Sequence, residues 1–227
     1  LLEALGHEVD MYHFNEAHAL PAVFRLIEKL GSVDKLKEKV IFTTHTPVKA
    51  GNEVNDPHLL HKLGFFNGFS IKEVEEMVGF ENGKFNHTLA ALRMSKHCNA
   101  VSKKHQEVSM EMWGEFEGIC DIIPITNAQN KGYWTDSEIE KAQVTKDNKK
   151  FIKRKKELKA QLFELVADQT GKVLDPNVLT VVWARRFAGY KRADLITRDV
   201  ARFERLMQNK DRPVQIIWAG KPYPLDY

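Results

Sequence analysis

Four cations fall within nine residues in the segment Ala184–Arg192, which reads Ala-Arg-Arg-Phe-Ala-Gly-Tyr-Lys-Arg. The segment follows an apolar run at 178–183 that is typical of a buried strand, and it precedes a helical pattern at 193–208. A guanidinium group can donate two parallel hydrogen bonds to a pair of oxygen atoms, and a helix N-terminus offers free N–H groups to an anion. The spacing therefore predicts a phosphate site, with a basic surface loop as the alternative.

Polar side chains also come directly after three other predicted strands. These residues are Asn15 with Glu16, then His45, then Asn127, and His18 lies close to the first pair. Ligands of open parallel sheets bind at the carboxyl ends of the strands, so we expect these side chains to share one edge. Hydroxyl groups and an imidazole suit a neutral polyol such as a sugar. A helix first-turn carboxylate is the alternative for Glu16, and a structural role is the alternative for His45.

The elements that must position these residues alternate between strands and helices. Strands are predicted at 9–14, 40–44, 100–102, 122–126, 178–183 and 214–219, and helices at 17–30, 57–63, 71–77, 86–97, 103–113, 137–167 and 193–208. This alternation predicts an α/β fold in which parallel sheets carry helices on both faces.

A capping box at Thr135–Glu138 predicts the start of a new helix, with a break near 146–148. The helix carries Phe151, Leu158, Leu162 and Leu165 on one stripe. We therefore expect one αβ domain over 1–134, a helical connection over 135–176 and the start of a second domain over 177–227.

Composition is that of a globular protein: 227 residues, 43% hydrophobic and 29% charged. A net charge of +3 is too small to indicate a nucleic-acid partner, and no apolar run approaches the roughly 18 residues of a membrane span. Cys98 and Cys120 lack disulfide-framework spacing, which favours a cytoplasmic setting. The chain starts like the tail of a helix and stops soon after a strand, so we expect a piece of a larger protein.

Two further patterns favour plain structural interpretations. The lysine-rich run at 149–156 has its apolar residues on a helical stripe, which indicates a solvated helix face rather than a nucleic-acid site. Two histidine pairs, His58 with His61 and His13 with His18, could suggest a metal, but the first has no neighbouring carboxylate or thiolate to complete a metal shell and falls on an ordinary polar helix. We therefore predict no metal site.

Several of these segments resemble one known family, in the same order along the chain. They are Tyr12–Ala19, Phe42–Val48, Asn99–Val108, Ile125–Trp134 and Ala184–Arg192, and Gln215–Lys221 adds a further match. The family is that of the α-glucan (glycogen, starch and maltodextrin) phosphorylases, glycosyltransferase family 35, and the resemblance is closer to its bacterial and archaeal branch.

The resemblance implies a GT-B fold, in which two Rossmann-like domains face each other, with this chain covering the end of the first and the start of the second. It implies a hexosyltransferase that converts α-1,4-glucan ends and inorganic phosphate reversibly into glucose 1-phosphate. The implied cofactor is pyridoxal 5′-phosphate, whose phosphate takes part in the proton chemistry. A homodimer is implied for the longer protein.

On the phosphate side, the resemblance assigns roles to five residues. Arg186 and Lys191 match catalytic residues that hold the substrate phosphate. Arg185 matches a cation near the cofactor phosphate, and Trp134 matches an aromatic residue near the cofactor. Tyr190 matches a tyrosine at the sugar site.

On the sugar side, His45 matches a catalytic histidine that binds the glucosyl unit and stabilises an oxocarbenium-like transition state. Glu16 takes the place of an acidic residue close to it, with His18 nearby. Asn127 matches an asparagine that bonds a sugar hydroxyl.

The sequence departs from the family pattern in several places. Ala128–Tyr133 replaces a glycine turn on the sugar side, Ala188 stands where many relatives have histidine, and His87 replaces a usual methionine. The family's cofactor lysine has no counterpart here, so we do not expect this chain to be active alone.

Two alternatives stay open. The first is a glycogen or starch synthase-like glucosyltransferase that uses a nucleotide sugar, and the second is a non-catalytic glucan-binding relative.

Overall fold

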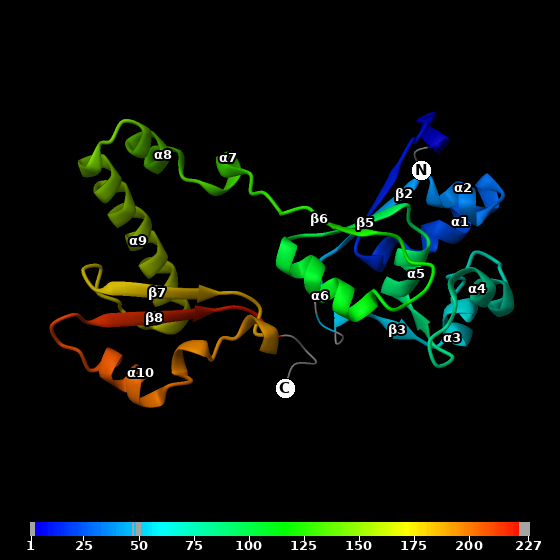
Figure 1. Cartoon of the computed structure of the whole chain (residues 1–227). Coiled ribbons are helices and arrows are strands. Elements are labelled where there is room, and N and C mark those ends of the chain that lie inside the picture. The colour runs from blue at the N-terminus through cyan, green and yellow to red at the C-terminus, as the bar shows by residue number, and fades with distance from the viewer. Residues whose placement is uncertain (1–2, 47, 49–50, 223–227) are drawn as a thin grey trace. The chain divides into compact units, whose positions relative to one another are not determined.

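A computed structural model describes residues 3–222 of the chain, apart from residues 47, 49 and 50. The chain divides into two compact units, Leu1–Gln129 and Asn130–Tyr227, which are described separately. Figure 1 colours the first unit from blue to green and the second from green to red.

The first unit is a mixture of helices and short strands. In chain order its elements are the 3-10 turn η1 (Glu3–Leu5), β1 (Tyr12–Asn15), the 3-10 turn η2 (Ala17–Ala19), α1 (Pro21–Leu30), α2 (Val33–Lys37), β2 (Val40–Thr44), β3 (Val54–Asn55), α3 (Pro57–Lys62), α4 (Ile71–Val78), β4 (Phe85–Asn86), α5 (His87–Arg93), β5 (His97–Ala100), α6 (Lys103–Trp113) and β6 (Ile122–Pro124). β5 ends at Ala100, the residue at which the strand predicted at 100–102 was expected to begin. Ser102 instead caps α6, with its hydroxyl accepting a hydrogen bond from the His105 N–H at 3.0 Å.

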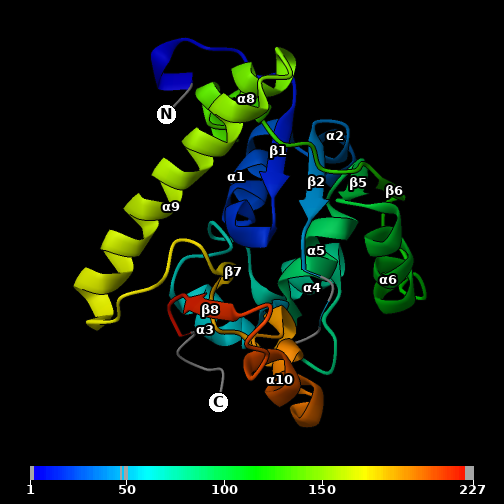
Figure 2. The ribbon, with the colours of Figure 1, turned by 90° about the vertical axis from the view of Figure 1, so that its left-hand side faces the viewer.

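Four strands of this unit form one parallel sheet in the order β1-β2-β5-β6. Figure 2 shows β1 and β2 pointing the same way. The register pairs Asn15 with Thr43 and Thr44 with Ala100. The strand ends that follow are therefore neighbours along one edge of the sheet. The prediction of a parallel α/β sheet is confirmed.

Helices cover one face of this sheet, not both. Phe14, Phe42, Ala100 and Ile122 point into a core that they share with residues of α1, α5 and α6. On the opposite face His13, Asn15, His97 and Ile123 are exposed. The reason is the strand order: each strand lies beside its predecessor in the sheet, and right-handed crossovers then place every helix on the same side. The expectation of helices on both faces is wrong for the described residues of this unit.

The core of the first unit is rich in phenylalanine. The Phe24 ring of α1 is fully buried and meets the rings of Phe66 and Phe85 at 5.1 and 6.5 Å. Local signals fix the helix that carries it. Pro21 opens α1, and Gly31 closes it with a φ of 83°, a left-handed conformation that glycine adopts without strain.

The second unit begins with three helices, α7 (Lys131–Trp134), α8 (Ser137–Val144) and α9 (Asn148–Thr170). The predicted helix break is confirmed, but the capping box is wrong. Asp136, not Thr135, caps α8, because its carboxylate accepts hydrogen bonds from the Glu138 and Ile139 N–H groups. The same carboxylate binds the Arg154 guanidinium of α9 at 2.9 to 3.2 Å, which fixes the two helices to each other.

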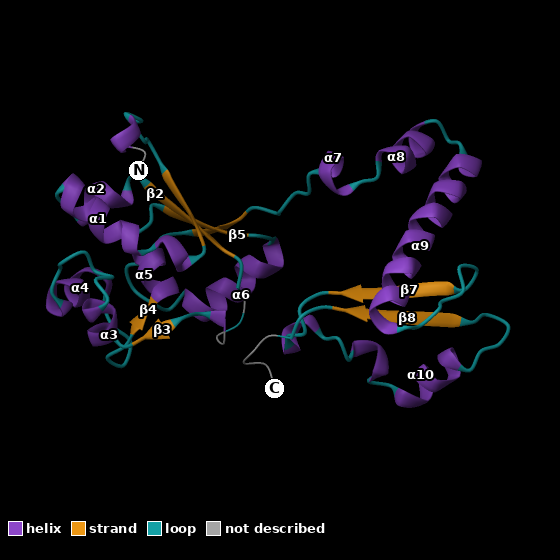
Figure 3. Cartoon of the chain, turned by 180° about the vertical axis from the view of Figure 1, so that it is seen from behind, coloured by secondary structure: helices purple, strands orange, loops and turns teal. Residues whose placement is uncertain are grey.

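The rest of the second unit is built on two strands. Its elements are β7 (Leu179–Ala184), the 3-10 turns η4 (Gly189–Lys191) and η5 (Leu195–Thr197), α10 (Val200–Met207) and β8 (Val214–Ala219). β7 and β8 pair in parallel, as the two adjacent arrows of Figure 3 show. On α9 the buried aromatic is Phe163, which lies off the predicted stripe, whereas Leu165 of that stripe is 54% exposed.

Candidate functional site

In the first unit the structure brings Glu16 and His45 together at the carboxyl ends of β1 and β2. One carboxylate oxygen of Glu16, Oε1, accepts a hydrogen bond from the His45 backbone N–H at 2.5 Å and another from the Thr46 hydroxyl at 3.0 Å. The Glu16 N–H in turn donates to the Thr43 carbonyl at 2.9 Å. The carboxylate therefore fixes the start of the turn that carries the His45 imidazole.

The backbone of Glu16 is strained. Its φ of 57° and ψ of −179° form a combination that is almost confined to glycine. Such a residue costs about 1–3 kcal/mol and persists only where surrounding bonds determine it. Here those bonds are the ones to the His45 N–H and the Thr46 hydroxyl. Backbone strain of this kind concentrates at functional sites, which favours a role for Glu16 beyond capping a helix.

The other two predicted residues of this edge lie further away. Asn127 follows β6, three strands from β1, which places it about 14 Å from the end of β1 by ordinary strand spacing. Its backbone N–H donates to the Val101 carbonyl at 3.0 Å, and its side chain is exposed. His18 is exposed on η2. The edge thus holds a tight Glu16–His45 pair with Asn127 at its far end.

His87, which departs from the family pattern, is a buried anchor beside this edge. Its Nε2 atom forms a 2.7 Å hydrogen bond with Asn55 Oδ1, and its ring contacts Phe65 and Phe85 edge-on. Burial lowers the pKa of His87, and the positive charge of His18 lowers it further, while Glu53 acts in the opposite direction. The residue therefore ties the start of α5 to the β3 segment.

In the second unit the basic loop follows β7, as predicted. The side chains of Arg185 and Arg186 are exposed, and the Lys191 ammonium lies 4.4 Å from the centre of the Tyr190 ring. Among the described residues, no carboxylate forms an ion pair with Arg185 or Lys191. The loop therefore presents positive charge that an anion could bind.

Two tryptophans that were not predicted as site residues hold this loop. Trp183 and Trp218 are paired in register on β7 and β8. The Trp183 indole N–H donates to the Lys191 carbonyl at 3.3 Å, and that of Trp218 donates to the Ala193 carbonyl at 3.1 Å. Both strands end in the same pattern, which is two aliphatic residues followed by Trp and Ala. This repeated pattern could have indicated the shared role of the two tryptophans.

The backbone fixes the loop from its other side. The Arg185 N–H donates to the Ala219 carbonyl at 3.0 Å and the Phe187 N–H to the Lys221 carbonyl at 2.9 Å, which extends the pairing beyond the strands. A Cβ atom on Gly220 would lie 1.7 Å from the Arg185 carbonyl oxygen. Only glycine fits this position.

The helix N-terminus that was expected to assist the loop is not where the sequence suggested. The loop continues through η4 to Arg192, whose φ of 53° is left-handed, and then through η5. α10 begins only at Val200, and the Asp199 carboxylate occupies its N-terminus by accepting from the Arg202 N–H. Between Arg192 and α10 the chain forms only the short 3-10 turn η5, so the prediction of a helix beginning at 193 is wrong.

Trp134 lies on α7 and is 73% exposed. Its ring meets that of Tyr133 edge-on at 5.1 Å. Within the departure at 128–133, Asn130 caps α7 by accepting from the Tyr133 N–H at 3.2 Å. The segment that differs from the family pattern therefore forms the start of a short helix, on which Tyr133 and Trp134 are exposed as an aromatic pair.

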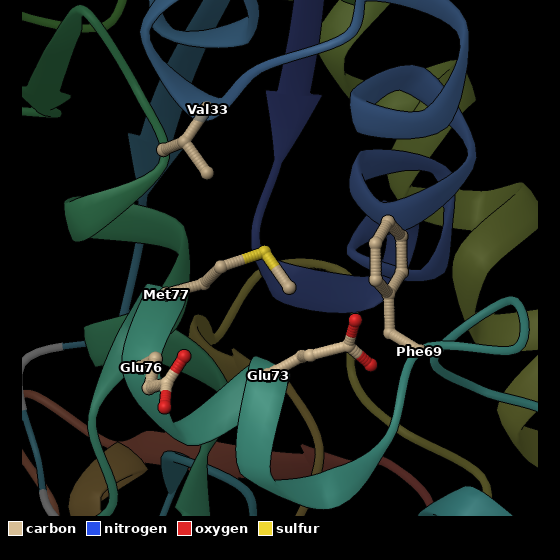
Figure 4. Close-up of a pocket in the computed structure, with 5 residues that line it drawn as sticks. All are labelled: Val33, Phe69, Glu73, Glu76 and Met77. Carbon is tan, nitrogen blue, oxygen red and sulfur yellow. The ribbon is translucent and has the colours of Figure 1, made fainter.

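A shallow pocket of the first unit contains none of the predicted residues. It is lined by Val33, Phe69, Glu73, Glu76 and Met77. Figure 4 shows the Glu73 carboxylate directed toward Phe69. That carboxylate also accepts from the Ser70 N–H and hydroxyl at the start of α4, so it serves as a helix cap.

Neither a metal cluster nor a membrane-spanning helix occurs among the described residues. No group of three His, Cys, Asp or Glu side chains there is arranged to hold a metal ion. No helix in the same residues has both the length and the apolar character that crossing a membrane requires.

Comparison with known proteins gives relatives along the entire chain. An uncharacterized protein of Methanocaldococcus jannaschii is 48% identical over 96% of the chain. The glycogen phosphorylase of Aquifex aeolicus is 32% identical, and the maltodextrin phosphorylase of Thermococcus litoralis 33%, each over 100% of the chain. No protein-family model matches.

The chain spans 41% of the length of the first two relatives and 33% of the third. All three alignments cover almost every residue of the chain itself. The chain is therefore similar from end to end to a part of proteins named as phosphorylases of glycogen and of maltodextrin.

Proposed function

We propose that this chain is the central part of an α-glucan phosphorylase of GT-B fold, a cytoplasmic hexosyltransferase. In this proposal 1–134 completes the first Rossmann-like domain, 135–176 connects, and 177–227 begins the second. The longer protein acts on α-1,4-glucan, inorganic phosphate and glucose 1-phosphate, and a homodimer is its proposed assembly. The free thiols of Cys98 and Cys120 agree with the cytoplasmic setting.

On the sugar side, the His45 imidazole binds the glucosyl unit, because its backbone is fixed by Glu16 and its side chain is exposed. Asn127 offers an amide that both donates to and accepts from sugar hydroxyls. His18 and Tyr190 contribute further hydrogen-bonding groups. As positive charge develops at the sugar C1 atom, the fixed polar groups around His45 stabilise it without reorganising.

On the phosphate side, the chemistry of the loop fits phosphate. Arg186 and Lys191 hold the substrate phosphate, and Arg185 holds that of pyridoxal phosphate, with Trp134 beside the cofactor. Guanidinium forks match phosphate oxygens in pairs, and the ammonium adds a point charge. When bound, the cofactor supplies a second phosphate group that exchanges protons with the first.

The reaction retains the configuration at the sugar C1 atom and replaces one glycosidic bond with one bond to phosphate. The bond between the sugar C1 atom and the O4 atom of the next glucose breaks, and the leaving O4 takes a proton from the substrate phosphate. An oxygen of that phosphate then bonds to C1 and gives glucose 1-phosphate. Arg186 and Lys191 keep the phosphate in place throughout, so that the reaction is effectively intramolecular.

The observation that carries the proposal is the basic loop. Trp183 and Trp218 hold its backbone at Lys191 and at the following Ala193, in a chain that aligns over its whole length with named phosphorylases. A loop held in this way has a fixed geometry for an anion, which a mobile surface loop would lack.

The test uses the longer polypeptide, loaded with pyridoxal phosphate and given maltodextrin. Release of glucose 1-phosphate that depends on inorganic phosphate is expected. Arg186→Ala should lower kcat/KM for phosphate by about 10- to 100-fold, since a charged hydrogen-bonding partner is lost, with little change in glucan affinity.

The matched control is Arg198→Ala, because Arg198 lies in the same segment but bonds to Asp194 at 3.1 Å. This variant should keep the wild-type kinetics. An equal loss of glucan affinity in Arg186→Ala would contradict the assigned role. Transfer from a nucleotide sugar in place of phosphorolysis would favour the synthase-like alternative.

A non-catalytic glucan-binding protein is the second candidate. The exposed Tyr133–Trp134 pair favours it, because sugar rings stack on exposed aromatic faces. Glucan binding without any glucose 1-phosphate release by the wild-type protein would support it.

A further inference from the structure

Two buried polar atoms have no hydrogen-bond partner among the described residues. They are Thr44 Oγ1, at the end of β2, and His105 Nε2, in the first turn of α6. Thr44 is 1% exposed and His105 7%. A buried polar group without a hydrogen-bond partner is destabilising, so an unpaired state of both atoms would be unfavourable.

The protonation of His105 is set by its neighbours. Its Nδ1 atom accepts a hydrogen bond from the Val101 N–H at 3.2 Å, so the ring proton lies on Nε2. Burial lowers the pKa of His105, while Glu16 raises it and His45 lowers it. The ring is therefore neutral near pH 7 and offers an Nε2–H donor. The effects of Glu16 and His45 also mean that the ring lies within electrostatic range of both.

Both atoms lie beside the same two backbone residues. Thr44 pairs in register with Ala100, and the His105 ring binds the N–H of the next residue, Val101. On α6 the buried residues His105, Ser109 and Trp113 recur every four positions and so form one stripe. This stripe faces the sheet, and Thr44 is on the buried face of that sheet with Phe42 and Ala100.

We infer that Thr44 Oγ1 and His105 Nε2 together bind one buried water molecule, which fixes α6 to the end of β2 next to the Glu16–His45 turn. The oxygen atom of this water can accept a hydrogen bond from the Nε2–H group, and the water can form a second hydrogen bond with the threonine hydroxyl. Buried waters usually have about three such partners. Because both residues are buried, the proposed occupant is a water molecule and not a glucan hydroxyl.

The direct test is a crystal structure of the 227-residue chain at high resolution. An ordered water is expected within about 2.7–3.2 Å of both atoms. A direct bond between the two side chains, a protein partner for either atom, or a dry gap would each overturn the inference. The test does not depend on catalytic activity.

Two histidine variants separate the two ring nitrogens. In His105→Asn the shorter amide can still accept from the Val101 N–H but does not reach the water. In His105→Gln the longer amide reaches the water but gives up that acceptor. Crystals of the glutamine variant should therefore keep the water, and those of the asparagine variant should lack it. Retention in both would contradict the role of Nε2.

A double-mutant cycle tests the coupling in solution. Thr44→Val and His105→Asn should each lower the urea midpoint, and the double variant should lose less than the sum, because either change alone disrupts the shared water. Thr44→Ser keeps the hydroxyl and should stay close to wild type. Additive losses would show that the two side chains act independently, and the inference would then be wrong.

One consequence rests on the proposed function. In the longer polypeptide His105→Asn should lower kcat for phosphorolysis without raising KM for phosphate, and His105→Gln should restore part of the loss. Here His105 is a positioning residue that acts through the Glu16–His45 turn. An unchanged kcat in His105→Asn would refute that positioning role, whereas an inactive wild-type protein would refute the proposed function and leave the structural tests standing.

Discussion

The two units of this chain use their hydrophobic residues very differently. In the first unit a single core joins four strands to helices on one side. In the second unit the only buried hydrophobic residues among those described are Ala142 and Phe163. Leu179, Val182 and Trp218 of its two strands remain 65%, 45% and 38% exposed.

The difference shows that site geometry and stability come from separate sources. Parallel sheets are normally buried on both faces, and a two-stranded one buries little by itself. The basic loop is nevertheless well held, because hydrogen bonds from Trp183 and Trp218 and the close approach at Gly220 fix it locally. In the first unit the Glu16–His45 turn depends on a sheet whose core stabilises every strand.

Truncation of a buried side chain should lower the free energy of unfolding much more in the first unit than in the second, and we expect this to be the largest difference between them. Phe24→Ala removes a fully buried ring with several ring neighbours and should destabilise the first unit by about 3–5 kcal/mol. Phe163→Ala in α9 should cost clearly less, because that ring has few buried neighbours. Urea unfolding followed by amide signals from each unit measures both values.

Equal losses from the two truncations would contradict the comparison. Phe203, half-buried on α10, provides a matched control, since Phe203→Ala should also cost less than Phe24→Ala.

Acid should affect the first unit through His87. The pKa of this histidine is below its ordinary value of 6.5 in the folded chain. The unfolded state therefore binds a proton first as pH falls, and stability decreases from about pH 7 downward, by at most about 1.4 kcal/mol per pH unit. His87→Met should remove this dependence, while its thioether keeps contact with Phe65 and Phe85.

The measurement is the urea midpoint of both proteins from pH 7 to 5. His61→Met, at an exposed histidine of α3, serves as the control and should follow the wild type. Parallel pH profiles for wild type and His87→Met would exclude His87 as the source of the acid sensitivity.

In the second unit, the contact between α8 and α9 should keep its contribution to stability in mild acid. The Arg154 guanidinium, followed by backbone hydrogen bonds, lowers the pKa of Asp136 to about 2. A depressed carboxyl pKa contributes stability above the unfolded value of about 3.9, and that contribution is lost as pH falls toward 2. Arg154→Met should thus slightly lower the melting temperature at pH 7 and have no effect at pH 2.

Lys153→Met is the matched control for this pair, because Lys153 is the neighbouring, exposed cation. A destabilisation by Arg154→Met that persists at pH 2 would mean that Arg154 contributes by packing rather than by its charge.

Much of the architecture follows from local sequence signals. Strands at 40–44 and 214–219 and the helix at 103–113 coincide with the predicted bounds, because apolar runs and capping residues mark them. The single covered face of the sheet was not predictable in the same way. It depends on the order of strands in space, which hydrophobic patterning does not specify.

The site residues show a similar division. The pairing of Glu16 with His45 follows from the general rule that parallel strands end at one edge, and it was expected. The roles of Trp183, Trp218 and Thr46 were missed, since each depends on a hydrogen bond to a backbone or side chain that only the folded chain brings near. The late start of α10 was missed because Leu195 and Ile196, which lie in η5, continue the helical spacing of the apolar residues of α10.

The strained backbone at Glu16 has a consequence for how this chain can change. Glycine at that position would relieve the strain and make the fold cheaper to form, yet it would remove the carboxylate that holds the His45 turn. Replacement of Glu16 by glycine would therefore exchange backbone strain for the loss of the hydrogen bonds to the His45 N–H and the Thr46 hydroxyl. The local backbone conformation and the geometry of the His45 turn can for this reason change only together.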